Sequence, residues 1–216
     1  MSREMHCPLC DGPGGDFHRD RRRPYLRCGR CLLVWVPPAF LLAPEREKAE
    51  YDLHQNRPDD PAYRGFLGRL AGPLLQRLAA GCSGLEFGCG PGPALAAMLR
   101  EAGHRVSLYD PFYFPNPGAL EVCYDFITAT EVVEHLHRPG AELERLWALL
   151  RPGGTLGIMT KLVRDREAFA TWHYKNDPTH VCFFSRDTWN WWAQCHGATA
   201  VFPENDVILL RKNAAT

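Results

Sequence analysis

Four cysteines near the amino terminus form one pattern with a clear chemistry. Cys7 and Cys10 make a C-x-x-C pair, Cys28 and Cys31 make a second, and seventeen residues separate the two pairs. Four thiolates at this spacing can surround one zinc ion tetrahedrally, and about forty residues have too little core to fold without such support. The pattern predicts a structural zinc ribbon; four free or disulfide-paired cysteines are the alternative.

A second group of residues combines carboxylates, histidines and a tyrosine. The candidates for catalysis are Glu131, Glu134, His135, Tyr174 and His180. The first three follow an apolar segment that reads as a strand, and the other two lie in the polar stretch 172–180. Ligands of open α/β sheets lie beyond the carboxyl ends of the strands, so both parts of the group are expected to border one crevice.

Three kinds of chemistry fit this second group. Its two carboxylates and two imidazoles can bind a divalent ion, which lowers the pKa of a substrate hydroxyl. The candidate ligands of that ion are Glu131, Glu134, His135 and His180. Without a metal, the histidines can line the pocket or act as a base near neutral pH. A merely structural role is the third alternative.

A glycine-rich turn forms the centre of the chain. Three glycines at alternate positions, from Gly88 to Gly92, follow the short apolar segment 84–87, and residues 93–102 carry an apolar helical face. This predicts a strand, a tight turn and a helix, where a ligand can approach main-chain atoms because no Cβ stands in the way. A dinucleotide-binding turn would need glycine at position 93, which is Pro93 here, so a nicotinamide cofactor is disfavoured.

The next predicted strand, residues 105–110, ends in a carboxylate about twenty residues beyond the turn, where an acid can accept both hydroxyls of a ribose. Together with the E-x-G-x-G-x-G pattern that starts at Glu86, this arrangement resembles the class I S-adenosylmethionine-dependent methyltransferases, of type 11 or type 23. The resemblance continues through residues 125–135 and 150–156, which look like the family's fourth strand and the turn into its fifth.

The resemblance covers roughly residues 60–212 and implies S-adenosylmethionine as the cofactor. It implies that the glycines approach the methionyl part and the ribose, that Glu86 supports the amino end and that Asp110 holds the ribose hydroxyls. The expected cofactor-binding residues are Glu86, Phe87, Gly88, Cys89, Gly90, Gly92, Asp110, Pro111, Phe112, Thr130, Glu131 and Tyr63. The segment ahead of the glycine strand often covers the cofactor in this family, so further pocket candidates are Tyr51, His54 and Asn56.

The pattern E-x-x-E-H that starts at Glu131, with the distant His180, carries a second resemblance. It is similar to the magnesium site of small-RNA 3′-terminal 2′-O-methyltransferases, and its E-H pair also resembles the ubiquinone-pathway O-methyltransferases. Many methyltransferases with E-H at this place use no metal. The resemblance therefore leaves the metal and the base roles both open.

The expected fold is α/β, with a Rossmann-like, doubly wound, mostly parallel sheet that ends in an antiparallel hairpin over 198–202 and 207–210. The family inserts a helix and a third strand before the fourth, but here only residues 111–124 intervene and their prolines forbid a long helix. That strand should be lost or reduced. Helices are expected over residues 63–80 with a kink or break at Pro73, 141–150 and 187–196. The expected domains are a zinc ribbon (1–40), a linker or lid (41–60) and the methyltransferase domain (61–216).

Composition limits the partners. The 216 residues carry 25 Lys and Arg against 25 Asp and Glu, so no net charge draws the protein to nucleic acid. No apolar run is long enough to span a membrane, and the amino terminus lacks the apolar core of a signal peptide. A cytoplasmic location is expected, with no membrane partner and with cysteines that stay reduced or bind metal.

Three functions remain open at this point. Methyl transfer to an O, N or C nucleophile of a small-molecule acceptor fits the neutral charge. RNA is the second candidate acceptor, because zinc-bearing ribosomal RNA methyltransferases share this layout and the run Arg21 to Arg23 could contact phosphates. The third is a non-enzymatic zinc-ribbon interaction module with a vestigial transferase domain, which only the shortened segment after Asp110 supports.

Overall fold

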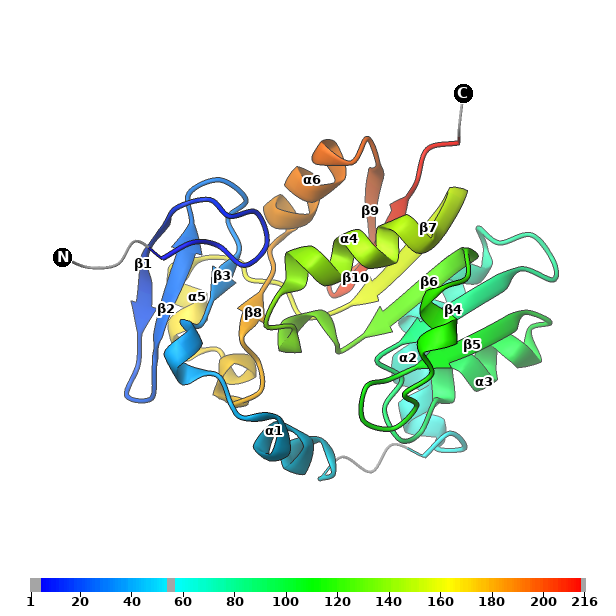
Figure 1. Cartoon of the computed structure of the whole chain (residues 1–216), viewed down its shortest axis with the longest axis horizontal. Coiled ribbons are helices and arrows are strands. Elements are labelled where there is room, and N and C mark those ends of the chain that lie inside the picture. The colour runs from blue at the N-terminus through cyan, green and yellow to red at the C-terminus, as the bar shows by residue number, and fades with distance from the viewer. Residues whose placement is uncertain (1–4, 54–56, 215–216) are drawn as a thin grey trace.

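In the computed structural model, which describes residues 5–53 and 57–214, a six-stranded sheet forms the centre of the larger part of the molecule (Figure 1). Its strands, in spatial order, are β5 (Arg105–Tyr109), β4 (Ser83–Phe87), β6 (Tyr124–Thr130), β7 (Leu150–Met159), β10 (Val207–Arg211) and β9 (Thr199–Glu204). The first four are parallel, and β10 is antiparallel to both of its neighbours. The prediction of a mostly parallel sheet with a terminal antiparallel hairpin is confirmed.

The shortened region between β5 and β6 is confirmed as well. The chain there forms the single 3₁₀ helix η2 (Pro117–Leu120), and β5 is the edge of the sheet in the described structure. Asp110 and Phe114 bond to each other in both directions through their backbones, so the chain turns back directly after β5. The prolines predicted to prevent a long helix lie in this turn and in η2.

The described residues form six α-helices: α1 (Pro44–Tyr51), α2 (Pro61–Leu75), α3 (Ala94–Glu101), α4 (Pro139–Leu149), α5 (Arg166–Thr171) and α6 (Arg186–Cys195). Helices α2 and α3 pack on one face of the sheet, and α4 and α6 pack on the other (Figure 1). Ser185 caps α6 in a capping box with Thr188. The prediction of a helix to residue 80 is wrong, because α2 ends at Leu75, two residues beyond Pro73.

The central strands are buried on both faces, which explains their nearly continuous apolar sequence. In β6, Phe126 contributes to the core under α2 and α3, and its neighbour Ile127 contributes to the core under α4 and α6. In β10, Leu209 and Leu210 alternate in the same way. The second of these cores also contains the apolar side chains of the ribbon, so it extends without interruption from the sheet into the amino-terminal segment.

The ribbon is a small antiparallel sheet of β1 (Gly14–Arg19), β2 (Pro24–Cys28) and β3 (Val34–Trp35), to which β8 (Cys182–Phe183) adds a fourth strand. Strand β8 comes from the far end of the chain, directly after the predicted stretch 172–180. The sequence did not indicate this pairing, because two residues are too few to show a period. Backbone hydrogen bonds to β8 therefore join the ribbon to the carboxy-terminal part of the chain, in addition to the packing of the shared core.

Within the described residues, no helix combines the length and the apolar character that crossing a bilayer requires.

Candidate active site

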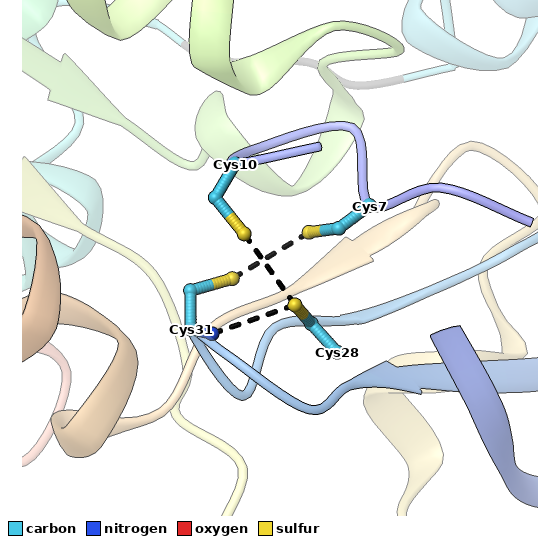
Figure 2. Close-up of side chains that lie close together, drawn as sticks. All are labelled: Cys7, Cys10, Cys28 and Cys31. Atoms are coloured by element: carbon cyan, nitrogen blue, oxygen red, sulfur yellow. Dashed lines mark hydrogen bonds between the residues drawn. The ribbon is translucent and has the colours of Figure 1, made fainter. Parts of the chain in front are cut away.

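The four predicted metal-binding cysteines come together in the ribbon (Figure 2). The Sγ atoms of Cys7 and Cys31 lie 3.5 Å apart, and those of Cys10 and Cys28 lie 3.4 Å apart. Four sulfurs at a zinc–sulfur distance of about 2.3 Å would lie about 3.8 Å from one another. The backbone N–H groups of Arg30 and Cys31 point at Cys28 Sγ, at 3.3 and 3.4 Å, as the support of a thiolate ligand requires. The cluster fits a structural zinc ion.

A cavity of about 700 Å³ opens beside the glycine turn, within the size range of small-molecule and cofactor sites. Gly88 and Gly90 line it with φ of 69° and 60°, a conformation that favours glycine. A Cβ on Gly88 would come within 2.5 Å of Val132, whereas a Cβ on Gly90 would meet no atom within 4 Å. The turn thus leaves its main chain open to the cavity, and the wall there fits a bound cofactor.

Asp110 forms part of the cavity wall next to this turn, and backbone N–H groups of nearby residues hold its carboxylate in place. Its Oδ2 accepts from the N–H of Gly90 at 2.9 Å, and its Oδ1 accepts from the N–H groups of Phe112 and Tyr113 at 2.8 and 3.0 Å. A carboxylate offers about four acceptor sites, so Asp110 retains capacity for a hydroxyl of a ligand.

Glu86 lies beneath the turn and not in the cavity wall. Its Oε2 accepts from the N–H of Ala96 at 2.7 Å, in the first turn of α3, where a negative charge is favoured. Burial raises the pKa of Glu86 to about 7, although the hydrogen bond from Ala96 opposes that rise. In this structure Glu86 therefore supports the helix that follows the turn.

At the other end of the cavity, Glu131 and Glu134 share the hydroxyl group of Tyr174. The Tyr174 hydroxyl oxygen lies 2.5 Å from Glu134 Oε1 and 3.2 Å from Glu131 Oε2, with Thr160 Oγ1 at 3.3 Å. Glu131 Oε1 and Glu134 Oε2 are buried and have no hydrogen-bond partner among the described atoms. One hydroxyl proton satisfies one carboxylate, so the pair needs a further proton or a cation.

The acid–base properties of this cluster agree with that reading. Burial raises the pKa of both Glu131 and Glu134, and the pKa of Glu134 rises further because of the charge of Glu131. The charge of Lys161 lowers the pKa of Glu131 only in part. Burial, followed by the two carboxylates, raises the pKa of Tyr174. The pair therefore tends to hold a proton near neutral pH unless a cation replaces it.

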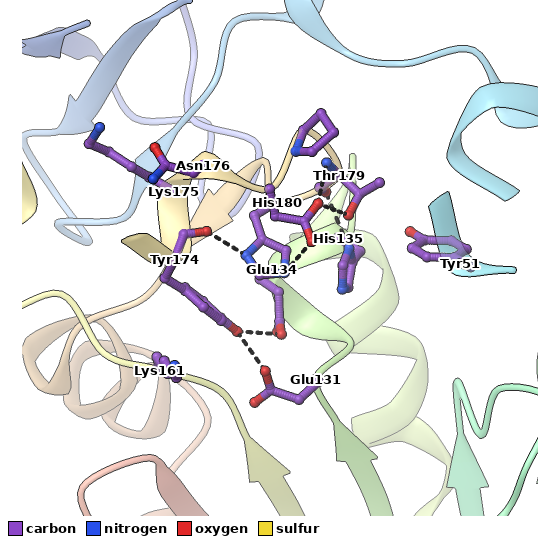
Figure 3. Close-up of polar contacts among 12 residues, drawn as sticks. Tyr51, Glu131, Glu134, His135, Lys161, Tyr174, Lys175, Asn176, Thr179 and His180 are labelled. Atoms are coloured by element: carbon purple, nitrogen blue, oxygen red, sulfur yellow. Dashed lines mark hydrogen bonds and ion pairs between the residues drawn. The ribbon is translucent and has the colours of Figure 1, made fainter. Parts of the chain in front are cut away.

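Two histidines lie over these carboxylates, with ring centroids 4.7 Å apart (Figure 3). His135, from the 3₁₀ helix η3 (Val133–His135), places Nδ1 3.3 Å from the carbonyl of Thr179. His180 places Nδ1 2.7 Å from the carbonyl of Tyr174. A carbonyl only accepts, so each Nδ1 atom is a donor.

The cluster has the donor set of a cation site. One ring nitrogen each from His135 and His180 and a carboxylate oxygen of Glu134 all lie within 4.8 Å of one another. Asp177 Oδ2 lies 3.7 Å from His180 Nε2 and forms an ion pair with that ring when the ring is protonated. Burial alone would raise the pKa of Asp177. Hydrogen bonds from Thr179 and the positive charges that His180 and His135 can carry lower that pKa overall.

Helix α1 connects the two ends of the cavity. The ring of Tyr51 lies 5.2 Å from that of His135 and 5.8 Å from that of Phe112, and the hydroxyl of Tyr51 donates to Glu47 at 2.8 Å. The hydroxyl of Tyr113 donates to Asp52 at 2.6 Å, just after the helix. Of the other residues predicted in this segment, His54 and Asn56 lie outside the described residues.

Most predicted residues meet in the cavity wall, and some do not. The predicted residues that line it are Tyr51, Tyr63, Phe87, Gly88, Cys89, Gly90, Asp110, Pro111, Phe112, Thr130, Glu131, His135 and His180. Glu86, Gly92, Glu134 and Tyr174 lie behind that wall in the described structure. Wall residues that the sequence did not indicate are Glu47, Phe66, His137, Arg138, Glu142, Arg145 and Asp177. Asp177 was recoverable, because it lies in the polar stretch already singled out.

The comparison with protein families gives one match. A family profile described as a methyltransferase domain matches residues 61–201, which is more than half of the chain. No curated protein matches.

Solved structures match over most of the chain. The 1,6-didemethyltoxoflavin N1-methyltransferase of Burkholderia thailandensis, solved with 1,6-didemethyltoxoflavin and S-adenosylhomocysteine, has a TM-score of 0.55 and 17% identity, covering 92% of this chain and 99% of its own. A putative S-adenosylmethionine-dependent methyltransferase of Methanococcus maripaludis has a TM-score of 0.51 and 10% identity, covering 80% and 94%. An O-methyltransferase family protein of Burkholderia thailandensis has a TM-score of 0.51 and 14% identity, covering 82% and 64%. At these identities the likeness concerns the fold.

Proposed function

The chain is an S-adenosylmethionine-dependent methyltransferase of the methyltransferase domain family, and we propose that it transfers the methyl group to a nucleophilic atom of a small-molecule acceptor. The observation that carries the proposal is one continuous cavity of about 700 Å³. It runs from the glycine turn and Asp110, which suit the cofactor, to His135 and His180, which suit an acceptor.

On the cofactor side, the main chain of Gly88 and Gly90 and the carboxylate of Asp110 would hold the methionyl part and the ribose. Phe112 and Tyr63 form the apolar walls nearby. The bound cofactor supplies an electrophilic methyl group on a sulfonium. The work of the protein is then to align the acceptor with that group and to exclude water.

On the acceptor side, His135 and His180 are the groups that would take a proton from the acceptor nucleophile. Their Nδ1 bonds to backbone carbonyls fix the orientation of both rings, and an imidazole can act as a base near neutral pH. Tyr174 and Glu134 form the polar floor beneath them. This assignment requires no metal ion.

A divalent cation is the alternative to a histidine base, and the residues fit one. Its ligands would be His135, His180 and Glu134, with Glu131 beside them, and the two unpartnered carboxylate oxygens would gain the positive charge that they lack. Imidazole and carboxylate donors suit Mg²⁺, Mn²⁺ or Zn²⁺, and such an ion lowers the pKa of an acceptor hydroxyl.

The contacts of the ribbon favour a small-molecule acceptor over RNA. Of the three arginines that suggested phosphate contacts, Arg23 is buried and Arg22 donates to the carbonyl of Asn176 at 2.7 Å. Only Arg21 remains exposed without such a contact among the described residues. The 1,6-didemethyltoxoflavin N1-methyltransferase of similar fold is named for a small-molecule acceptor, which is consistent with this choice. Against the third reading, the segment after Asp110 is compact and its turn is fully hydrogen bonded.

Isothermal titration calorimetry of the folded, zinc-loaded chain tests the proposal. S-adenosylmethionine and S-adenosylhomocysteine should each bind one site per chain, and an RNA oligonucleotide should not bind at physiological salt. If neither cofactor form binds, the proposed function is wrong. Salt-dependent RNA binding that Arg21→Gln weakens would instead support an RNA acceptor.

A further inference from the structure

Arg23 is buried at the tip of the ribbon hairpin, where its guanidinium reaches the loop that carries Tyr174 and His180. The four acceptors are the carbonyls of Lys175 at 2.9 Å, Asp177 at 2.9 Å, Pro178 at 3.1 Å and His180 at 2.8 Å. Its Nε also donates to the hydroxyl of Tyr25 at 3.2 Å. A planar group with five N–H donors is the one side chain that can serve so many carbonyls at once.

Neighbouring residues of the hairpin complete the clamp. Asp20 accepts from Lys175 Nζ at 3.0 Å, and both side chains are largely buried. The same carboxylate accepts the backbone N–H groups of Arg22 and Arg23, so the hairpin tip and the loop are fixed by one acid. These hydrogen bonds, together with burial that opposes them, leave the pKa of Asp20 well below its usual range.

The clamped loop would otherwise have many unsatisfied carbonyls. Between the 3₁₀ helix η4 (His173–Asn176) and β8, the chain has no regular structure that could pair them. A buried carbonyl that is left unpaired destabilises the conformation that buries it. The loop conformation that brings His180 Nδ1 to the carbonyl of Tyr174 therefore depends on donors from outside the loop.

The ribbon also contacts the element that carries the other histidine. Val181, which precedes β8, donates its N–H to the carbonyl of Glu134 at 2.8 Å and accepts from the N–H of Val36 at 2.9 Å. Cys182 Sγ donates to the carbonyl of Leu136 at 3.2 Å. The bonds to Glu134 and Leu136 join the segment around β8 to η3 and the residue after it, and the bond from Val36 joins that segment to the ribbon.

We propose that Arg23 is a positioning residue for the acceptor side, and that the zinc ribbon is part of the scaffold of the active site. The ribbon hairpin sets the loop that holds Tyr174 and His180, whereas the glycine turn and Asp110 make no contact with Arg23 or Asp20 among the described bonds. What the positioned groups do rests on the proposed function. The clamp itself rests on the contacts above.

Hydrogen–deuterium exchange of the full zinc-loaded chain tests the clamp without requiring a known acceptor. In Arg23→Gln, the amides of His180 and Val181 should exchange about tenfold to a hundredfold faster, because charged hydrogen bonds of about 1.5–3 kcal/mol are lost. The amides of β4 and β6 should be unchanged, and calorimetric affinity for S-adenosylhomocysteine should stay nearly the same.

Two variants separate geometry from charge. Arg23→Lys keeps the charge and loses the fork, so it should behave like Arg23→Gln. Arg21→Gln removes the same charge from an exposed site on the same hairpin and should change nothing. The Nδ1–H resonance of His180 should weaken in the Arg23 variants and persist in the control.

Unchanged protection of Val181 in Arg23→Gln would overturn the proposal, as would an equal loss of protection throughout β4 and β6. If Arg23→Gln does not fold, Asp20→Asn decides, because it removes the ion pair to Lys175 and the oxygen that accepts from Tyr25, while its remaining oxygen can still accept from the backbone of Arg22 and Arg23. Faster exchange confined to the loop supports the clamp, and unchanged exchange rejects it. Failure of the wild type to bind S-adenosylhomocysteine would sink the proposed function and leave this test intact.

Discussion

At the cofactor end of the cavity, the glycine turn and Asp110 follow two adjacent strands, β4 and β5, whereas the acceptor end is assembled from segments far apart in the chain. The N–H of Gly90 in the glycine turn donates directly to the carboxylate of Asp110. His135 and His180 are 45 positions apart by number, and the arginine that holds the loop of His180 lies 157 residues before it. The first site is local in the chain; the second depends on long-range contacts.

This difference predicts that the two ends respond separately to damage. A change at the glycine turn should affect cofactor affinity, and a change at the ribbon or the loop should affect turnover. Helix α1 is the described element that contacts both ends, through Tyr51.

The largest effect is expected from removal of zinc. Structural zinc contributes about 10–16 kcal/mol to small ribbons, so chelation should unfold β1 to β3, release the loop and abolish turnover. S-adenosylhomocysteine binding should survive in part. Exchange measurements and calorimetry on the same chelated sample check this, and loss of structure at β4 together with the ribbon would contradict a separate cofactor end.

Restoring metals one at a time sharpens that experiment. Zinc alone should restore the ribbon and, with a histidine base, turnover. If turnover returns only after magnesium or manganese is also added, the divalent site at His135, His180 and Glu134 is supported over the base.

The next largest effect is expected at the histidines. His135→Ala and His180→Ala should each lower kcat by about 10²–10⁴, because they remove the acceptor-side base or ligand, while affinity for the cofactor stays nearly intact. His173→Ala is the matched control, since that exposed side chain contacts Lys161 and not the cavity. Full activity of both variants would show that the site assignment is wrong.

A smaller effect with the opposite pattern is expected at Asp110. Asp110→Asn should weaken S-adenosylhomocysteine binding about tenfold to a hundredfold, because charged hydrogen bonds are worth about 1.5–3 kcal/mol. Exchange at Val181 should not change. Asp59→Asn, at a surface ion pair with Arg57, serves as the control in the same calorimetric titrations. Equal affinity in all three proteins would remove Asp110 from the cofactor site.

The last effect is expected at Glu86; it concerns the stability of the fold rather than ligand binding, and it depends on pH. Its pKa is raised to about 7 in the folded state, so folding favours the protonated acid, and this contribution is present below pH 4.5 and lost as pH rises through 7. Glu86→Gln should therefore gain up to about 3 kcal/mol of unfolding free energy relative to wild type between pH 5 and 8. Urea denaturation of the wild type and of Glu86→Gln at pH 5 and at pH 8 measures this difference in unfolding free energy. Zinc release at low pH affects both proteins alike. A constant difference would contradict the buried acid.

The local end of the cavity was also the end that the sequence predicted well. The glycine turn, Asp110 and the loss of a strand after β5 follow from spacing and from prolines, which act on their own neighbours. The meeting of Glu134 and His135 with His180 was expected from strand ends alone and occurs in the structure.

The long-range end could not be predicted in the same way. For the run Arg21 to Arg23, the sequence predicted only a possible contact with phosphates. Nothing near this run in sequence indicates that Arg23 is buried against Lys175, 152 positions away. Strand β8 is too short to show a pattern. Long-range contacts decide both.

The most direct test of the account follows the methyl group itself. The zinc-loaded chain would be incubated with S-adenosylmethionine labelled in the methyl group and with separate small-molecule and RNA fractions of a cell extract, in parallel with His180→Ala. We predict label in a small molecule with the wild type and none with the variant. Label in RNA, or equal labelling by the variant, would contradict the account.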